Sequence, residues 1–406
     1  MGIRDFFRFK KPEKPPSENI QDFLYEEDSH ADTQSEQFLD DGQVEATFDK
    51  IEMGPEADYI QDTRSKPEGP QKETDYPGPV GLDVGTANIV TAHGGAPAVK
   101  TFIQLNAFYA IPYSSITRQT LLRDDIPFFH KDQKLYILGY HSEDFASMLG
   151  GEIRRPIDSG ILNPKEVEAI SVIKALINGL VKKPKKIGEK ICFSVPGEPL
   201  DGRTSVVYHE SIIKMHLRSL GYTPIPINEG LAVVLAELSG NNYTGIGISM
   251  GGGMCNVCFS YLSVPVMSFS IQKGGDYIDA MVANSVGESP YRVRMIKEKE
   301  LDLSAEPQTR VETGLHIFYE DLFKTLLQSL KQVLGTSDKI PRLSKPIPLV
   351  LSGGTVLPNG TRDKFIKSLQ EFRLPIKISD IVITKKPLYA TAKGALVLAR
   401  TEEAEI

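Results

Sequence analysis

The chain has 406 residues, enough for two or three domains, and 40% of them are apolar, which supplies a sizeable core. No apolar run approaches the roughly 20 residues that span a bilayer, the start shows no signal-peptide pattern, and three cysteines favour a reducing cytoplasm over a disulfide framework. The net charge of −7 is unevenly spread, because residues 11–78 carry −13 and residues 79–406 carry +4. This balance shows no strong basic patch and predicts no nucleic-acid partner.

The first eleven residues differ from everything that follows, and Pro12 ends them. On a helix, Ile3, Phe6 and Phe7 would lie on one side, with the basic residues on another. Residues 1–11 therefore have the composition of an amphipathic membrane-binding segment; the alternative is a disordered N-terminus. A single anchor of this kind binds weakly, so attachment to the inner face of the cytoplasmic membrane would need many copies in an assembly.

Residues 12–78 are rich in Glu, Asp, Pro, Gln and Ser. Their few apolar side chains cannot offset the entropy of ordering, so we expect a disordered acidic linker. Two apolar islands, Phe23 to Tyr25 and Ile51 to Met53, leave open a second interpretation, in which the leader docks on a protein partner.

From residue 79 onward the pattern predicts alternating strands and helices, which is typical of α/β sheets covered by helices. The predicted strands are 79–84, 87–92, 190–195, 224–228, 245–250, 255–260 and 347–352. The predicted helices are 164–182, 203–220, 229–239, 276–286, 315–334, 361–371 and 388–401. Cys255 and Cys258 fall on one predicted strand and point to opposite faces, which disfavours a metal or redox site.

Two glycine-centred segments copy one another. Gly81 to Asn88 aligns with Gly247 to Met254, so that Asp83 matches Ser249 and Gly85 matches Gly251. In each segment a strand runs into a sharp turn of small residues, and such turns expose successive N–H groups that bind anions. One such turn in each half predicts two lobes that hold a polyphosphate between them.

The order of short motifs over residues 79–400 resembles the actin, DnaK-type chaperone and sugar-kinase superfamily, and most of all the MreB-type bacterial actins. Besides the two phosphate loops, the matching stretches are Gly139 to Gly150, Arg155 to Gly160, Val195 to Gly197, Ile227 to Ala232, Gly274 to Asp279, Met295 to Lys299 and Leu351 to Thr355. Each motif alone is weak, whereas the series in this order is specific.

The resemblance implies an actin-like ATPase fold of class α/β, with two lobes, each a mixed sheet flanked by helices. It places lobe I at 79–243, lobe II at 244–386 and a helix returning to lobe I at 387–402. It further implies a cytoplasmic protein that binds ATP and Mg²⁺. Such a protein assembles with itself into cytoskeletal filaments that can determine cell shape. The filaments would be peripheral on the cytoplasmic membrane if residues 1–11 bind it.

The resemblance also assigns roles to individual residues. Asp83 would face Mg²⁺ through bound water, since a carboxylate beside a polyphosphate is repelled unless a cation lies between them. Glu229 would be the catalytic residue that orients the attacking water. The phosphate-binding residues would be Gly85, Thr86, Ala87, Asn88, Gly251, Gly252, Gly253 and Met254. The adenosine-binding residues would be Met295, Ile296, Lys297, Glu298, Gly353, Gly354, Thr355 and Val356.

The chain departs from the family at the site itself. Ser249 replaces an Asp that helps hold the metal's water shell, and Met254 and Cys255 replace threonines. Gly230 replaces a proline, which predicts a looser helix start. We therefore expect slow or absent ATP hydrolysis. A non-polymerising nucleotide-binding scaffold, a chaperone-like ATPase and a small-molecule kinase of the same fold remain alternatives.

Overall fold

A computed structural model describes residues 78–94, 99–202, 205–337, 340–341, 343 and 345–404. The predicted membrane-binding segment, 1–11, and nearly all of the predicted linker, 12–78, lie outside these residues. None of the described helices has the length and apolar character of a membrane span.

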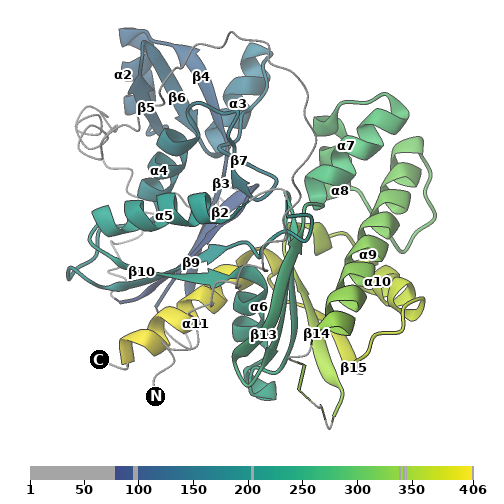
Figure 1. Cartoon of the computed structure of the whole chain (residues 1–406). Coiled ribbons are helices and arrows are strands. Elements are labelled where there is room, and N and C mark those ends of the chain that lie inside the picture. The colour runs from purple at the N-terminus through teal and green to yellow at the C-terminus, as the bar shows by residue number, and fades with distance from the viewer. Residues whose placement is uncertain are drawn as a thin grey trace, which may run out of the picture. The chain divides into compact units, whose positions relative to one another are not determined.

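The first lobe is built on a five-stranded sheet in the order β10-β9-β1-β2-β3 (Figure 1). Its strands are β1 (Val80–Val84), β2 (Asn88–His93), β3 (Lys100–Leu105), β9 (Lys190–Val195) and β10 (Thr223–Asn228). One face packs against α4 (Ala169–Leu180) and α5 (Val207–Ser219). The other face packs against α11 (Ala390–Ala404), which follows all the other elements in sequence.

A smaller part of the first lobe surrounds a three-stranded antiparallel sheet in the order β4-β6-β5. Its elements are β4 (Phe108–Pro112), α2 (Ser115–Arg123), β5 (Phe128–Lys131), β6 (Lys134–Leu138) and α3 (Tyr140–Leu149). The short hairpin of β7 (Ile157–Asp158) and β8 (Ile161–Leu162) follows.

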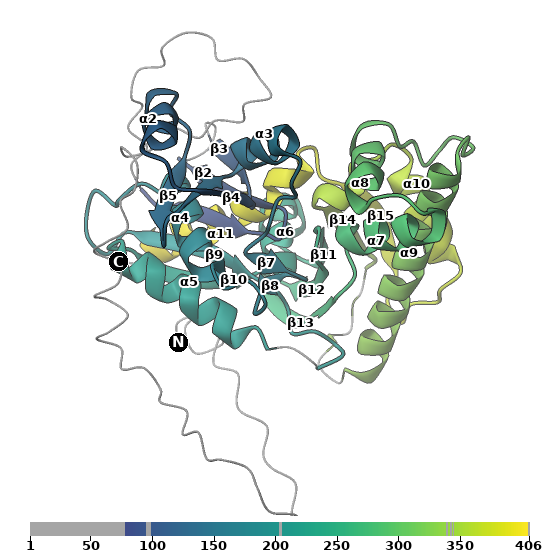
Figure 2. The same cartoon turned by 90° about the horizontal axis from the view of Figure 1, so that it is seen from above.

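The second lobe is built on a sheet in the order β13-β12-β11-β14-β15. Its strands are β11 (Gly245–Met250), β12 (Cys255–Tyr261), β13 (Val264–Ile271), β14 (Ile347–Ser352) and β15 (Ile378–Ile383). Its helices are α7 (Gly275–Val286), α8 (Pro290–Lys299), α9 (Arg310–Thr336) and α10 (Thr361–Gln370), which gather on one face (Figure 2). Short 3₁₀ turns lie at Ser239–Asn241, Gly354–Val356 and Pro387–Tyr389.

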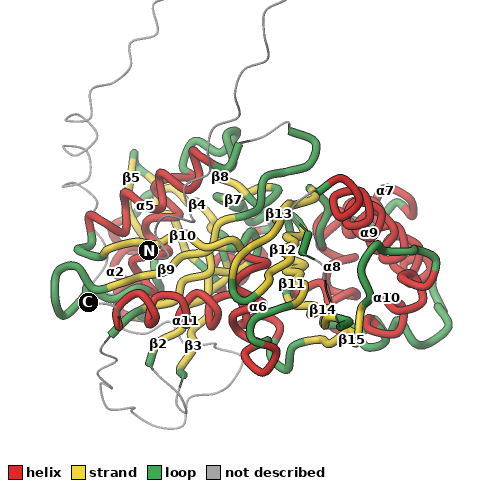
Figure 3. Tube along the Cα trace, turned by 60° about the horizontal axis from the view of Figure 1, so that its bottom comes forward, coloured by secondary structure: helices red, strands yellow, loops and turns green. Residues whose placement is uncertain are grey.

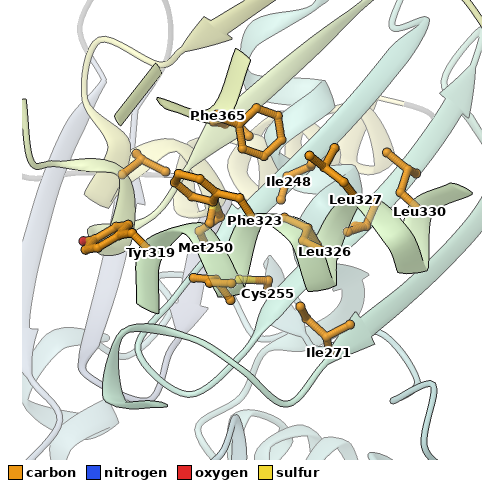
Figure 4. Close-up of a cluster of buried hydrophobic side chains, with 14 of the residues drawn as sticks. Ile248, Met250, Cys255, Ile271, Tyr319, Phe323, Leu326, Leu327, Leu330 and Phe365 are labelled. Atoms are coloured by element: carbon orange, nitrogen blue, oxygen red, sulfur yellow. The ribbon is translucent and has the colours of Figure 1, made fainter. Parts of the chain in front are cut away.

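The core of the second lobe lies between its sheet and α9. Side chains of α9 that recur at helical spacing, such as Phe323, Leu326 and Leu330, pack toward Ile248 and Met250 of β11 (Figure 4). Cys255 belongs to this core, whereas Cys258 packs on the opposite face of the sheet against α6 (Glu229–Glu237). The prediction that the two cysteines point to opposite faces is confirmed.

Helices α6 and α11 connect the two lobes. α6 packs on β11 and β12 of the second lobe, α11 packs on β1 and β9 of the first, and the two helices pack on each other (Figure 3). Only small residues allow this approach: a Cβ atom on Gly394 would lie 1.7 Å from Ala232 O, and one on Gly81 would lie 2.1 Å from Ala392 O. The crossing is therefore backbone against backbone.

All seven predicted strands and all seven predicted helices are present, although several bounds were wrong. α9 starts at Arg310 rather than 315, because the Thr309 side chain accepts a hydrogen bond from Glu312 N and caps the helix. α4 starts at Ala169 rather than 164, because Asn163 Oδ1 accepts from Lys165 N in a turn before it. The elements not among the predicted strands and helices are β3, β4, β5, β6, β7, β8, β13, β15, α2, α3 and α8.

Candidate nucleotide-binding site

The two glycine turns have the same geometry. In the first hairpin Val84 pairs with Ile89, and in the second Met250 pairs with Cys255, so each turn holds four residues. Gly85 N donates to Asn88 O at 3.0 Å, and Gly251 N donates to Met254 O at 3.0 Å. The duplication read from the sequence is therefore a duplication of backbone structure.

In both turns the carbonyl groups are engaged by neighbouring parts of the protein. Asn106 holds the first turn, with Nδ2 donating to Gly85 O at 2.8 Å and its backbone N donating to Ala87 O at 2.9 Å. In the second turn Gly251 O accepts from Thr355 Oγ1 at 2.8 Å and from the N–H of Gly275, and Gly252 O accepts from the N–H of Asp276.

The amide groups of the same turns are not engaged in this way. Within the described part of the chain, the N–H groups of Thr86, Ala87, Gly252 and Gly253 find no acceptor. Each turn therefore offers two successive donors, which is the arrangement that binds a phosphate oxygen.

The two turns also lie against one another. A Cβ atom on Gly252 would lie 3.4 Å from Ala87 Cβ, and one on Gly253 would lie 2.4 Å from Thr86 Oγ1. Thr86 Oγ1 accepts a hydrogen bond from Gly160 N at 3.1 Å. Bare backbone in the second turn is what allows the two sets of donors to approach.

Two carboxylates lie beneath the turns. Asp83 ends β1, where Ser194 Oγ donates to its Oδ1 at 2.7 Å and accepts from Val84 N at 2.9 Å. Glu229 begins α6, and its Oε2 accepts from Ser249 Oγ at 3.0 Å. Burial raises the pKa of Asp83 to about 6, and burial together with the nearby charge of Asp83 raises the pKa of Glu229 to about 8. Two crowded carboxyls of this kind favour a bound cation or proton.

The departures from the family pattern have distinct structural consequences. Ser249 bonds to Glu229 and occupies the place of a third carboxylate. The Met254 side chain is buried against Gly160, where a Cβ atom would lie 2.5 Å from Met254 Cε, so Met254 contributes only its backbone to the turn. The prediction that Gly230 loosens the start of α6 is wrong. Asn228 Oδ1 caps this helix by accepting a hydrogen bond from Leu231 N, and a Cβ atom on Gly230 would lie 2.5 Å from Cys258 N.

The predicted adenosine residues divide into two groups. Gly353, Gly354 and Thr355 lie at the end of β14 beside the second turn, and a Cβ atom on Gly353 would lie 2.2 Å from Met250 O. The Val356 and Ile296 side chains pack in the second core, and Met295 is half-buried. Lys297 is buried, donating to Asp279 Oδ2 at 2.7 Å and Gly275 O at 2.9 Å, while Glu298 is half-exposed beside Arg294.

Two ion pairs join the lobes beside the turns, and sequence reasoning missed both. Arg155 Nη1 lies 2.9 and 3.0 Å from the carboxylate oxygens of Asp276, and Arg294 Nη2 lies 2.5 Å from Glu143 Oε1. Both Arg155 and Asp276 belong to recognised motifs, so their separate positions were visible, but their pairing was not.

We expect Arg155→Ala to accelerate release of bound nucleotide about tenfold, because a half-buried charged hydrogen bond between the lobes contributes roughly 1.5 kcal/mol. Stopped-flow release of a fluorescent ATP analogue measures this rate. Arg373→Ala, at an exposed position of the second lobe, is the matched control. Equal release rates in the two variants would show that the pair does not hold the lobes together.

The raised pKa of Glu229 predicts a pH-dependent stability. The carboxyl titrates near 4.5 when unfolded and near 8 when folded, so between these values the folded state binds more protons. Stability of the nucleotide-free protein should therefore fall as the pH rises from about 4.5 to about 8. Glu229→Gln should flatten this decline, measured as Tm against pH in a chelator, whereas Glu152→Gln at an exposed position should not. A decline of unchanged slope in Glu229→Gln would refute the assignment.

Comparison with known proteins places this site in a family. A sequence model of the volactin family matches residues 79–399. No curated protein sequence matched the chain.

Solved structures with the same fold include actin-like proteins. The MamK double helical filament has a TM-score of 0.60 at 17% identity, covering 79% of this chain and 98% of that one. MreB 5 of Spiroplasma citri bound to AMPPNP has a TM-score of 0.58 at 15% identity, covering 82% and 98% of the two chains. The same protein bound to ADP has a TM-score of 0.55 at 17% identity, covering 80% and 97%. The fold is thus actin-like, and the chain, matched over residues 79–399, belongs to the volactin family.

Proposed function

We propose that this volactin binds ATP with Mg²⁺ between its lobes and polymerises into filaments, with slow hydrolysis. The observation that carries the proposal is the pair of turns with the same hydrogen-bond pattern. These turns lie against one another between the lobes, and each has two N–H groups without an acceptor among the described residues. MreB 5 bound to AMPPNP and ADP, and MamK as a double helical filament, support nucleotide binding and self-association in proteins of this fold.

The residues present fit a magnesium–nucleotide complex. The N–H groups of Thr86, Ala87, Gly252 and Gly253 would bind phosphate oxygens, and glycines line the second turn where a side chain would intrude. Asp83, held by Ser194, would bind the waters around Mg²⁺, which supplies positive charge to the phosphates. Gly353 and Gly354 would border the base, and Lys297 would support that side through Gly275 O rather than by direct contact.

Glu229 would hold and orient the attacking water molecule, but its surroundings would make it a poor hydrogen-bond acceptor for that water. Its raised pKa keeps a proton on the carboxyl near neutral pH, and Ser249 occupies one of its oxygens. Met254 brings no hydroxyl to the water. Together these features support hydrolysis slower than that of actins which carry the family's aspartate and threonine.

Electron microscopy of purified protein with and without ATP and Mg²⁺ tests polymerisation, and calorimetry on the same preparation tests binding. We expect filaments only with nucleotide, and phosphate release that increases in Ser249→Asp. Nucleotide uptake without filaments would favour the alternative of a non-polymerising scaffold. The departures from the family pattern at Ser249 and Met254 support that alternative. No uptake of adenine or guanine nucleotide would refute both.

We further propose that filaments attach to the inner face of the cytoplasmic membrane through residues 1–11, which lie outside the described structure. The support is the basic-aromatic composition of that segment. Fusing several copies of residues 1–12 to a fluorescent protein tests this. Purely diffuse fluorescence would rule it out.

A further inference from the structure

A loop of the first lobe concentrates positive charge. Residues 182–189 between α4 and β9, here named the lysine loop, hold four lysines and one glutamate, a net charge of +3. Residues 79–406 together carry +4, so the loop accounts for most of the net positive charge of the body. The side chains of Lys182, Lys183, Lys185 and Lys186 are exposed. Ile187, which follows them, is 94% exposed.

The loop is fixed in place despite this repulsion. Tyr222 Oη donates to Lys182 O at 2.6 Å, and Gly188 N donates to Gly221 O at 2.8 Å. Pro184 packs on Gly221, where a Cβ atom would lie 3.2 Å from Pro184 Cγ. Within the loop Glu189 is the single acidic residue, and its Oε1 accepts from Lys186 N. Like charges held together by the backbone gain free energy when an anionic segment covers them.

The acidic leader joins the body beside this loop. β9 begins at Lys190, where the loop ends, and pairs in parallel with β1, with Val80 opposite Ile191. The chain therefore enters β1 next to the lysine loop. Residues 63–77, which precede β1 in the sequence, include three acidic and three basic residues and have no net charge.

The next segment back along the chain has the complementary composition. Residues 51–62 hold four acidic residues and no basic one, a net charge of −4, with Tyr59 and Ile60 among them. Fifteen residues with the dimensions of a random coil would span about 20 Å, which would bring residues 51–62 within reach of the adjoining loop. We propose that residues 51–62 dock on the lysine loop of the same chain, with acidic groups on the lysines and apolar groups on Ile187.

Tethering favours this occupant over a free polyanion. A short flexible linker gives an effective concentration in the millimolar range, so weak individual contacts suffice. Because the contacts are exposed charge pairs, they should weaken strongly when salt shortens the screening length from about 10 Å to about 3 Å.

Crosslinking of the full chain tests the proposal. The three native cysteines are buried, so Ala57→Cys and Ile187→Cys place two accessible thiols for a bismaleimide. We expect efficient crosslinking within one chain at low salt and at least about a fivefold loss at 1 M salt. A control pair joins Ala57→Cys to Gln332→Cys, at an exposed position of α9, and should crosslink poorly.

Charge reversal separates docking from random collision. Reversing the loop with K182E, K183E, K185E and K186E should abolish the crosslink, and adding E52K, E56K, D58K and D62K should restore it. Recovery in the second variant also shows that the reversed loop folds. Equal crosslinking before and after loop reversal, or a yield no higher than the control pair, would overturn the proposal. Crosslinks that form only between chains when single-cysteine variants are mixed would also overturn it, in favour of a second copy as the partner.

Discussion

Gly394→Ala is expected to destabilise the protein by at least about 3 kcal/mol, because overpacking a close contact already costs 1–3 kcal/mol and here the obstacle is backbone. The added Cβ atom would lie 1.7 Å from Ala232 O and 2.5 Å from Ala232 C. Neither helix can accommodate it by changing a rotamer, so α6 and α11 must separate. Since these helices connect the lobes, the separation would also disturb the position of Glu229 at the start of α6.

The same substitution elsewhere provides a control of opposite sign. Gly335 lies in α9, and a Cβ atom there would meet nothing within 4 Å. Gly335→Ala should therefore stabilise the protein by about 0.5–1 kcal/mol through helix propensity and a less flexible unfolded chain. Urea unfolding followed by circular dichroism measures both variants. Similar stabilities for the two would mean that the α6–α11 crossing tolerates separation.

Gly253→Ala is expected to lower ATP affinity by at least about tenfold, whereas Gly252→Ala should change it much less. The Cβ atom on Gly253 would lie 2.4 Å from Thr86 Oγ1 and 2.5 Å from Gly160 N, which forces the two turns apart. The Cβ atom on Gly252 would meet nothing closer than 3.3 Å. The tenfold figure corresponds to about 1.4 kcal/mol, the value of one hydrogen bond to a charged group.

Isothermal titration with ATP and Mg²⁺ measures both affinities, and thermal unfolding without nucleotide verifies that both variants fold. Since the two glycines are adjacent in one turn, effects on turn flexibility are matched, and the variants differ in whether the added Cβ atom clashes with Thr86 and Gly160. Greater loss of affinity in Gly252→Ala than in Gly253→Ala would contradict the arrangement of the turns.

Strands with strong local signals were predictable. Lys190–Val195, Gly245–Met250 and Ile347–Ser352 have the predicted bounds, because each is a short apolar run between turn residues and is buried along its length. β15 was missed because Ile378–Ile383 mixes exposed and buried positions at a sheet edge. α2 was missed because a short helix with the single buried residue Leu121 has little apolar periodicity.

The candidate site was predictable as far as it depends on local backbone. The match between Gly81–Asn88 and Gly247–Met254 is visible in the sequence, since a sharp turn after a strand requires small residues there. Roles that depend on distant neighbours were not predictable. Asn106 and Ser194 are ordinary polar residues in sequence, and become supports for Gly85 and Asp83 only through hydrogen bonds across the fold.

By itself, the sequence determined the fold class, the duplicated turns and the charge separation between leader and body, because each follows from the pattern of neighbouring residues. Tertiary structure alone decided which charges meet: that Lys297 pairs with Asp279, that Arg155 reaches Asp276, and that Asp83 and Glu229 share one buried region. It also decided why Gly230 and Gly394 are glycine, since the atoms that exclude a side chain belong to segments far away in the chain. Steric exclusion and Coulomb interaction act through space, and a linear pattern does not contain those distances.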